Sequence, residues 1–437
     1  MTIALCQAFG TRKEKRRWYV STLELQLASL GFCRLCRSAP TLHLRIDNDT
    51  PHTLWAPRKD EPRHQSRNHV SPSPTSSSSS HAGASAVETM RTRVPVIQAA
   101  RVTWRRGGKD LVESGAMEHW PCVDTLSLEA VGSWSELESV ALPPSLHRLV
   151  IELSIEIPLQ AVVWPAHLER LSIGFPVNTP IAGVVWPASL QELQFGDAFN
   201  QSIAAVVWPI SLQKMFFGYA FNQPIVAVVW PAHLRQLSFG RRFDQPIAGV
   251  LWPAYLKELS FGRCFNQPIV GVVWPSSLQQ LSFETFNQPI TGVVWPSSLQ
   301  KLNFGNSFIH PIADVVWPAS LQQLSFGYFF NQPVAGVLWP AYLKELSFGM
   351  CFNEPIAGVF WPACLQTLRF ENSFEQPIAG VVWPASLRSL FFGITFNQST
   401  AGIVWPVSCD VYRQKMGFTG PYDYRIVRRL RRPTPAM

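Results

Sequence analysis

The segment 265–283, with the sequence FNQPIVGVVWPSSLQQLSF, decides the architecture of this chain. Its Trp-Pro pair recurs along the chain with a spacing of 22 residues, except for one step of 21 residues. A regular period of this length is typical of a solenoid, in which each repeat packs against its two neighbours. The tryptophans of the pairs are Trp164, Trp186, Trp208, Trp230, Trp252, Trp274, Trp295, Trp317, Trp339, Trp361, Trp383 and Trp405.

Each repeat contains one predicted β-strand. Counted from the tryptophan, leucine stands four residues later in eleven of the twelve repeats, and a second leucine stands seven residues later in ten. Phenylalanine follows at the ninth position in ten repeats, so apolar and polar residues alternate as in a half-buried strand. Glycine occupies the tenth position in nine of the eleven repeats that continue, which favours a sharp exit from the strand. In the last repeat, Cys409 and Tyr412 take the two leucine positions.

The other side of each repeat is predicted to be extended, because two prolines per repeat interrupt helix formation in segments such as PIAGVVWP. We therefore predict an all-β-like solenoid of the leucine-rich-repeat type, with 22-residue rungs and a non-helical convex side. It should contain about 12–14 short parallel strands. Its structural spine is expected to comprise Trp186, Trp208, Trp230, Trp252, Trp274, Trp295, Trp317, Trp339, Trp361 and Trp383.

Two features of the turns lead to further expectations. Asparagine recurs in one column of the repeat, and its side chain is expected to satisfy backbone groups of the turn in the neighbouring rung. One residue is missing between Phe283 and Phe286, where Glu284 replaces the glycine, and we expect a local shift of the turn without a break in the sheet. The asparagine column comprises Asn200, Asn222, Asn266, Asn287, Asn331, Asn353 and Asn397.

The chain divides into four regions on the basis of composition and repeat pattern. Residues 1–117 are predicted to be a mostly disordered, basic and Ser/Pro-rich region, because their composition buries too little apolar area to offset chain entropy. Residues 118–163 are interpreted as degenerate capping repeats, and residues 164–408 as the regular solenoid. Residues 409–437 are interpreted as a C-terminal cap and a basic tail.

Charge is distributed unevenly among these regions. The net charge of +8 comprises +9 for residues 1–117 (18 basic minus 9 acidic) and −7 for residues 118–410 (12 minus 19). Residues 411–437 add +6 (7 minus 1). The repeat body is therefore acidic, and nucleic acid is not an expected ligand of its surface.

The sequence also indicates a cellular compartment. Ten mostly apolar residues precede the basic run 12–17, the reverse of the order in a signal peptide, and no uninterrupted apolar run approaches 18 residues. The eight cysteines show no disulfide framework. We expect a cytoplasmic protein that is not secreted and has no membrane span, with nuclear import left open by the basic clusters.

The repeat resembles the FNIP repeat, a short variant within the leucine-rich-repeat class. The resemblance rests on FNQP at 221–224 and on Trp-Pro at 230–231, followed by Leu234, Leu237 and Phe239. It is strong over 164–405 and weak over 120–163, where Leu142-Pro143 keeps the Leu-Pro form usual in the family. What the resemblance implies is a curved solenoid used for protein–protein contact.

No catalytic, cofactor-binding or metal-binding residue is predicted. Nucleophilic catalysis needs a nucleophile, a base and an orienting group together, but the histidines of the body never recur in one column and no carboxylate pair repeats. The chain has no phosphate-binding loop of the GxxxxGK[ST] type. Cys33 and Cys36 resemble half of a zinc knuckle without a second pair at ligand spacing.

Three groups of residues are candidates for partner contact. Arginine and tyrosine are frequent hot-spot residues, and Tyr219, Arg241, Arg242 and Arg263 fall at the turn positions of three consecutive rungs. We predict that this rim binds an acidic or phosphorylated protein segment. On the concave face Phe216, Arg369 and Phe391 interrupt a column that is mostly serine. Tyr328, Phe329 and Met350 form an apolar group at the turns.

The sequence favours a non-enzymatic scaffold for protein–protein interaction, with a polar concave sheet and a variable turn rim. The partner protein is not identified by any motif, and the oligomeric state is left open. One alternative is a structural or adhesive rod without a specific ligand, because residues 250–268 and 337–355 are almost identical. The other alternative is tethering to an anionic surface or nucleic acid through the basic ends.

Overall fold

The structure, a computed structural model, describes residues 43–46, 101–104, 123–129, 142–152, 159–174, 177–414 and 424–428. It separates into two compact units. The first unit consists of residues 1–155 and 163–168, and the second consists of residues 156–162 and 169–437.

Among its described residues, the first unit contains four parallel strands. They are β1 (His43–Ile46), β2 (Arg101–Trp104), β3 (Thr125–Glu129) and β4 (Arg148–Glu152), and each pairs with the next. Leu126 and Leu149 lie in register on β3 and β4 and are fully buried. Strands β1 and β2 fall within the region 1–117, where the sequence predicted no strand. The rest of that region, with its predicted disorder, lies outside the described residues.

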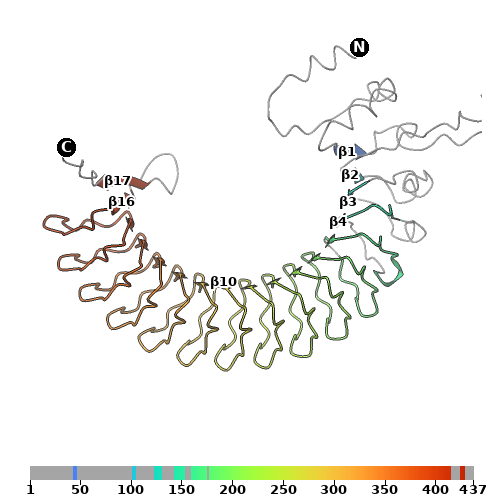
Figure 1. Ribbon diagram of the computed structural model, residues 1–437, viewed down its shortest axis with the longest axis horizontal. Helices are drawn as coiled ribbons and strands as arrows, with labels where there is room; N and C mark the ends of the chain where they lie inside the picture. Colours follow the sequence, from blue (N-terminus) through green and yellow to red (C-terminus); the bar gives the residue numbers. More distant parts are fainter. Residues whose placement is uncertain are drawn as a thin grey trace, which may run out of the picture. The chain divides into compact units, whose positions relative to one another are not determined.

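The second unit is a stack of short strands, one for each rung. Strands β5 to β16 pair in chain order and are all parallel, and in Figure 1 they follow the inner edge of the arc that this unit forms. The final strand, β17 (Tyr424–Arg428), pairs antiparallel with β16. The parallel strands are β5 (Arg170–Ile173), β6 (Glu192–Phe195), β7 (Lys214–Phe216), β8 (Gln236–Ser238), β9 (Glu258–Phe261), β10 (Gln280–Phe283), β11 (Lys301–Asn303), β12 (Gln323–Ser325), β13 (Glu345–Ser347), β14 (Thr367–Arg369), β15 (Ser389–Phe392) and β16 (Asp410–Gln414).

The core of the second unit consists of columns of identical side chains. Phe217 stacks on Phe239 with ring centroids 5.6 Å apart, and Phe221 stacks on Phe243 at 6.1 Å. Tryptophans stack in the same way, with 6.3 Å between the centroids of Trp252 and Trp274. Eight of the ten predicted spine tryptophans are buried, and Trp252 and Trp339 are half-buried. These tryptophans therefore lie in the apolar core of the stack.

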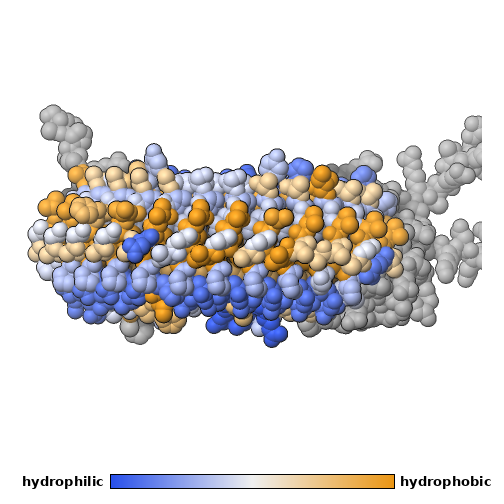
Figure 2. Space-filling view, turned by 90° about the horizontal axis from the view of Figure 1, so that it is seen from below, coloured by the Kyte–Doolittle hydropathy of each residue, from blue (hydrophilic) through white to orange (hydrophobic). Residues whose placement is uncertain are grey.

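The outer side of the unit is extended, as the prolines predict. Of two adjacent valines there, one side chain is buried and the next is exposed: Val272 is 4% exposed, whereas Val273 is 81% exposed. Gly271 turns the chain just before them, with a left-handed φ of 79°. The one helical segment among the described residues of this unit is a single 3-10 turn, η3 (Leu159–Ala161). Figure 2 shows the resulting row of exposed apolar side chains on the outer face, which consists of Val185, Val207, Val229, Leu251, Val273, Val294, Val316, Leu338, Phe360, Val382 and Val404.

Asparagine side chains connect the turns of successive rungs. The Oδ1 atom of Asn200 accepts a hydrogen bond from the backbone N–H of Asn222, at 2.8 Å, and Asn222 accepts one from Asp244 at 2.9 Å. Asp244 continues the series with its own carboxylate, which accepts from the N–H of Asn266 at 2.9 Å. The predicted role of this column is confirmed, and aspartate performs it as well as asparagine.

The glycines that follow the strands serve a purpose different from the predicted one. A sharp exit would have required a left-handed φ, but in this column only Gly305 has one, at 70°. A Cβ atom on Gly327 would instead lie 1.2 Å from the carbonyl oxygen of Gly305, and one on Gly240 would lie 1.8 Å from that of Gly218. Close approach of backbone between rungs therefore disfavours a side chain at these glycines, whereas Glu284 and Glu371 stand at the same position of two other rungs.

The two irregular rungs behave differently. At the 21-residue step, Leu281 of β10 still pairs with Leu302 of β11, so the sheet continues unbroken, as predicted. In the last rung the register slips by one residue, and Val411 rather than Tyr412 pairs with Leu390. The assignment of Tyr412 to a leucine position was therefore wrong. The slip keeps the apolar valine inside and turns the amphipathic tyrosine outward.

The adjacent valines provide a matched test of the outer segment. Replacing Val272 by alanine should lower the free energy of unfolding by about 1–3 kcal/mol, because buried methyl groups are lost and a cavity is left. Val273→Ala should change it by less than about 0.5 kcal/mol, since that side chain is already in water. The guanidinium midpoint of the full chain, followed by circular dichroism, measures both, and equal effects would contradict the alternation.

Substitution of Asn222 tests the turn connection. Asn222→Ala should cost about 1–3 kcal/mol, because it removes the acceptor of the Asp244 N–H and leaves that donor unsatisfied. Asn222→Asp keeps the acceptor and should cost clearly less than Asn222→Ala at pH 7, the remaining cost being repulsion between its carboxylate and that of Asp244 one rung further on. Thermal unfolding of both variants measures the difference. If both substitutions were equally costly, the hydrogen bond would not be the reason for the column.

Candidate functional site

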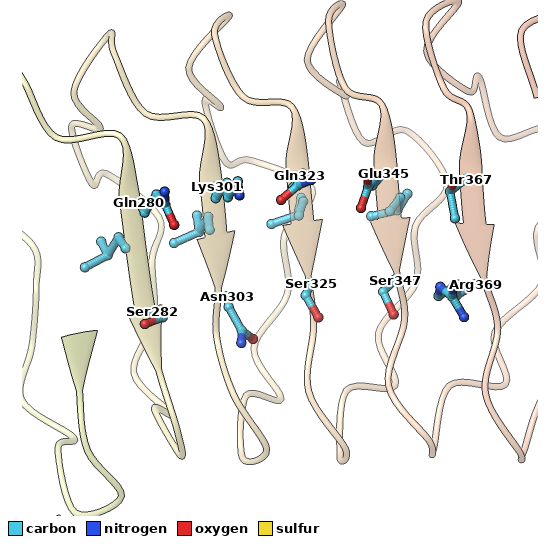
Figure 3. A pocket seen from close by; sticks show the side chains of 14 residues that line it. Gln280, Ser282, Lys301, Asn303, Gln323, Ser325, Glu345, Ser347, Thr367 and Arg369 are labelled. Atoms are coloured by element: carbon cyan, nitrogen blue, oxygen red, sulfur yellow. The ribbon is translucent and has the colours of Figure 1, made fainter. Parts of the chain in front are cut away.

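The inner face of the strands carries two parallel rows of polar side chains. Within each strand the central leucine points inward and is buried, so the residues on either side of it point outward. Between β10 and β14 these side chains line a groove of about 430 Å³, here termed the strand groove. Figure 3 shows its two rows, Gln280, Lys301, Gln323, Glu345 and Thr367 in one and Ser282, Asn303, Ser325, Ser347 and Arg369 in the other.

Most side chains that line the strand groove are neutral, and a few carry a positive or a negative charge. Lys301 and Glu345 are exposed in one row, and Arg369 ends the other. The serines provide short hydroxyl groups, which donate and accept hydrogen bonds and leave room for a partner's side chains. Such a surface is suited to hydrogen bonding with another polypeptide rather than to the enclosure of a small molecule.

The predicted concave contacts fall in two separate places. The guanidinium carbon of Arg369 lies 3.8 Å from the ring centroid of Phe391, and Phe391 stacks on Tyr412 at 4.6 Å. These three residues form a continuous cationic and aromatic surface at the end of the strand groove. Phe216 is remote from them, on β7 between Gln194 and Ser238. Sequence reasoning missed Tyr412 because only the register slip brings it to this face.

The predicted rim residues lie at the turns that follow β7, β8 and β9. The guanidinium carbons of Arg241 and Arg242 each lie 5.3 Å from the ring centroid of Tyr219, so both arginines make cation–π contacts with this ring. Arg263 is exposed at the corresponding turn of the next rung. We call Tyr219, Arg241, Arg242 and Arg263 the arginine patch. None of its three arginines forms an ion pair with another residue that the structure describes.

A second groove, of about 700 Å³, runs along the same rim and is termed the rim groove. Its lining includes Arg263 toward one end and Tyr328 and Met350 further along. Glu284 and Glu371 also line it, and these are the two residues that replace glycine at the strand exits. Burial raises the pKa of the Glu371 carboxyl above its usual value, although the nearby positive charge of Arg369 opposes the shift.

The polar contacts of the described histidines are to single neighbouring groups, and the Nδ1 atom of His147 lies 3.2 Å from the Oδ1 atom of Asp124. Within the described ranges, no three histidine, cysteine or carboxylate side chains are grouped to hold a metal ion. The Nδ1 atom of His233 lies 3.1 Å from the carbonyl oxygen of Ile210, and the Nε2 atom of His310 lies 3.3 Å from that of Asn287. The half zinc knuckle Cys33–Cys36 lies outside the described residues, as does His119, one of the histidines of the repeat body.

The stacked strands, the extended outer segments and the polar inner face define a solenoid of the leucine-rich-repeat type. The family model of the FNIP Repeat matches residues 178–220 and 286–329. Together with the fold, this match identifies the chain as an FNIP-repeat protein with a leucine-rich-repeat-like solenoid. None of the proteins of curated function matches the sequence.

Among solved structures, the chain is similar to CroV588, described as a novel circular LRR protein. The two are 36% identical, the similarity covers 71% of this chain and 46% of CroV588, and the TM-score is 0.63. The chain therefore spans about half the length of CroV588. An internalin (inlF) from Listeria monocytogenes is 17% identical, with 69% of this chain and 83% of that chain covered and a TM-score of 0.44. Across the part of the chain that is described, no helix has the length and apolar character to span a bilayer.

The described cysteines should differ sharply in reactivity. Burial, aided by the negative charge of Asp410, raises the pKa of the Cys409 thiol to about 12, and the side chain is fully buried. At pH 8 its thiolate is therefore scarce and inaccessible, whereas Cys264 is exposed beside Arg263. Peptide mapping after N-ethylmaleimide treatment at pH 8 should show Cys264 modified and Cys409 unmodified. Both should react in guanidinium, and rapid labelling of Cys409 in the folded protein would contradict its burial.

Proposed function

We propose that this protein is a non-enzymatic scaffold that binds a partner protein across the strand groove and the adjoining rim. The observation that carries this proposal is the pair of polar rows on β10 to β14, half-exposed above a fully packed apolar core. Structural requirements fix the buried columns, so the outward positions are the ones free to recognise a ligand. Solenoids of this class generally act by binding rather than by catalysis.

The residues within the strand groove support a protein ligand. Side-chain amides, hydroxyls and a few charges of both signs match the mixed polar surface of a polypeptide, and the aromatic surface of Phe391 and Tyr412 offers an apolar contact at one end. The acidic balance of residues 118–410 disfavours nucleic acid on this face. The near identity of residues 250–268 and 337–355 keeps a structural rod as the alternative.

Quantitative affinity purification with the full chain tests the proposal. The double variant Ser282→Arg, Gln323→Arg places a long cation on two alternate strands, β10 and β12, at positions that line the strand groove and not the rim groove. Recovery of the partner should fall about tenfold or more, because the groove is filled and charges are left unpaired. The matched control, Ser276→Arg with Ala319→Arg, adds the same charges to exposed turns of the same two rungs and should retain the partner.

The outcomes separate the alternatives. A partner that is lost with the groove variant and kept with the control supports recognition through the strand groove. A partner that binds both variants equally contradicts it. If no protein is recovered above the background of an unrelated solenoid, the structural rod is the better interpretation.

A further inference from the structure

We propose that the rim groove binds an extended partner segment in a fixed direction, with an anionic side chain on the arginine patch and an apolar side chain on Tyr328, Phe329 and Met350. This inference rests on the proposed scaffold function and specifies the chemistry of one partner. The sequence offered the two groups of residues as separate candidates. The structure joins them, because Arg263, Tyr328 and Met350 line the same groove.

The arginine patch supplies the anionic subsite: Arg263 lines one end of the rim groove, and Arg241 and Arg242 continue the patch in the preceding rung. Its arginines lie in two successive rungs, whose strands pack about 4.8 Å apart, so their like charges repel one another. Tyr219 fixes two of the guanidinium groups over its ring, which lowers the entropy lost when they bind a ligand. Planar guanidinium groups bind carboxylate and phosphate oxygens with paired hydrogen bonds. An anionic partner residue would therefore relieve the repulsion and satisfy the donors.

Tyr328, Phe329 and Met350, here termed the apolar patch, supply the second subsite. Tyr328 is 43% exposed and Phe329 is 53% exposed, and their rings meet edge to face with centroids 4.8 Å apart. Met350 is half-buried in the next rung and contributes a flexible thioether side chain to the groove wall. Exposed aromatic rings beside a groove are typical anchors for an apolar side chain.

The floor between the two subsites is open to a polypeptide backbone. Gly305, Gly327 and Gly349 line this part of the groove, and the preceding rung excludes a Cβ from each of them. These three glycines carry no side chain over the floor, so a ligand can approach the main chain there. Glu284 lies over the same stretch and repels an acidic residue from it, which confines the anion to the arginine end.

The repeat geometry sets the spacing of the two partner residues. Arg263 and Tyr328 belong to rungs three steps apart, which corresponds to about 14 Å along the stack. An extended chain covers about 3.3–3.6 Å per residue. The anionic and the apolar residue of the partner should therefore stand about four or five positions apart. Glu371, at the far end of the groove, favours a basic residue beyond the apolar one.

Selection of a displayed library of random linear peptides on the full chain tests this inference. Enriched peptides should carry an acidic residue four or five positions from an aromatic or large aliphatic residue. Fluorescence anisotropy then measures binding of the best peptide, made with aspartate or with phosphoserine at the anionic position. The stronger binder of the two identifies whether the subsite prefers carboxylate or phosphate.

Three variants assign the binding to the rim. Arg241→Ala with Arg263→Ala should weaken binding about tenfold at low salt and much less at high salt, because exposed charge contacts are screened. Tyr328→Ala should weaken binding without altering its salt dependence. The control pair Arg235→Ala with Lys257→Ala removes two exposed charges from the same two rungs as Arg241 and Arg263 and should leave binding unchanged. All three variants alter exposed side chains, and circular dichroism verifies that they keep the fold.

The opposing results are equally specific. The inference would be overturned if the enriched peptides lacked the predicted spacing or if the library yielded no binder. It would also be overturned if the peptides bound the rim variants as tightly as the native chain. Peptides that depend on Ser282 and Gln323, which line the strand groove alone, but not on the rim variants would overturn it while leaving the proposed scaffold function intact. That function is judged separately, by the purification with the groove variant.

Discussion

Register between neighbouring rungs is the constraint on which the second unit depends. Each rung places the same side chain directly above its counterpart, so phenylalanine stacks on phenylalanine and leucine pairs with leucine. Backbone donors at the turns find their acceptor one rung away, in the side chain of Asn200 or its equivalents. A change in rung length would displace all of these contacts together. The 21-residue step is tolerated because the deletion lies in the turn, after the strand has already paired.

The strands and the core could be predicted from the sequence because their signal is local and repeated. Contacts between rungs could be predicted only in part. The asparagine column was recognised because an interior turn must satisfy its backbone, but the reason for the glycine column was wrong, since it depends on how closely Gly305 and Gly327 approach. The slip that turns Tyr412 outward was missed because valine and tyrosine both fit a strand pattern. The rim groove was also missed, because turns several rungs apart line it.

Stability and recognition use different positions of the same 22-residue unit. Buried columns are nearly invariant along the stack, and their energy comes from the burial of aromatic rings and leucines. Outward positions of the strands and turns vary from rung to rung, and the charged and aromatic side chains that interrupt the repeated pattern lie there. A surface of this kind acquires specificity by changing single residues, while the scaffold beneath it stays the same.

The nearest-neighbour character of the stack also governs its response to tension. A rung held only by the adjacent rung can detach without disturbing those further away. Each detachment would release 22 residues, or about 75 Å of extended chain, in place of a stacking distance of about 4.8 Å. Pulled from its ends, the solenoid would therefore lengthen in nearly uniform increments, as a molecular spring that yields one coil at a time.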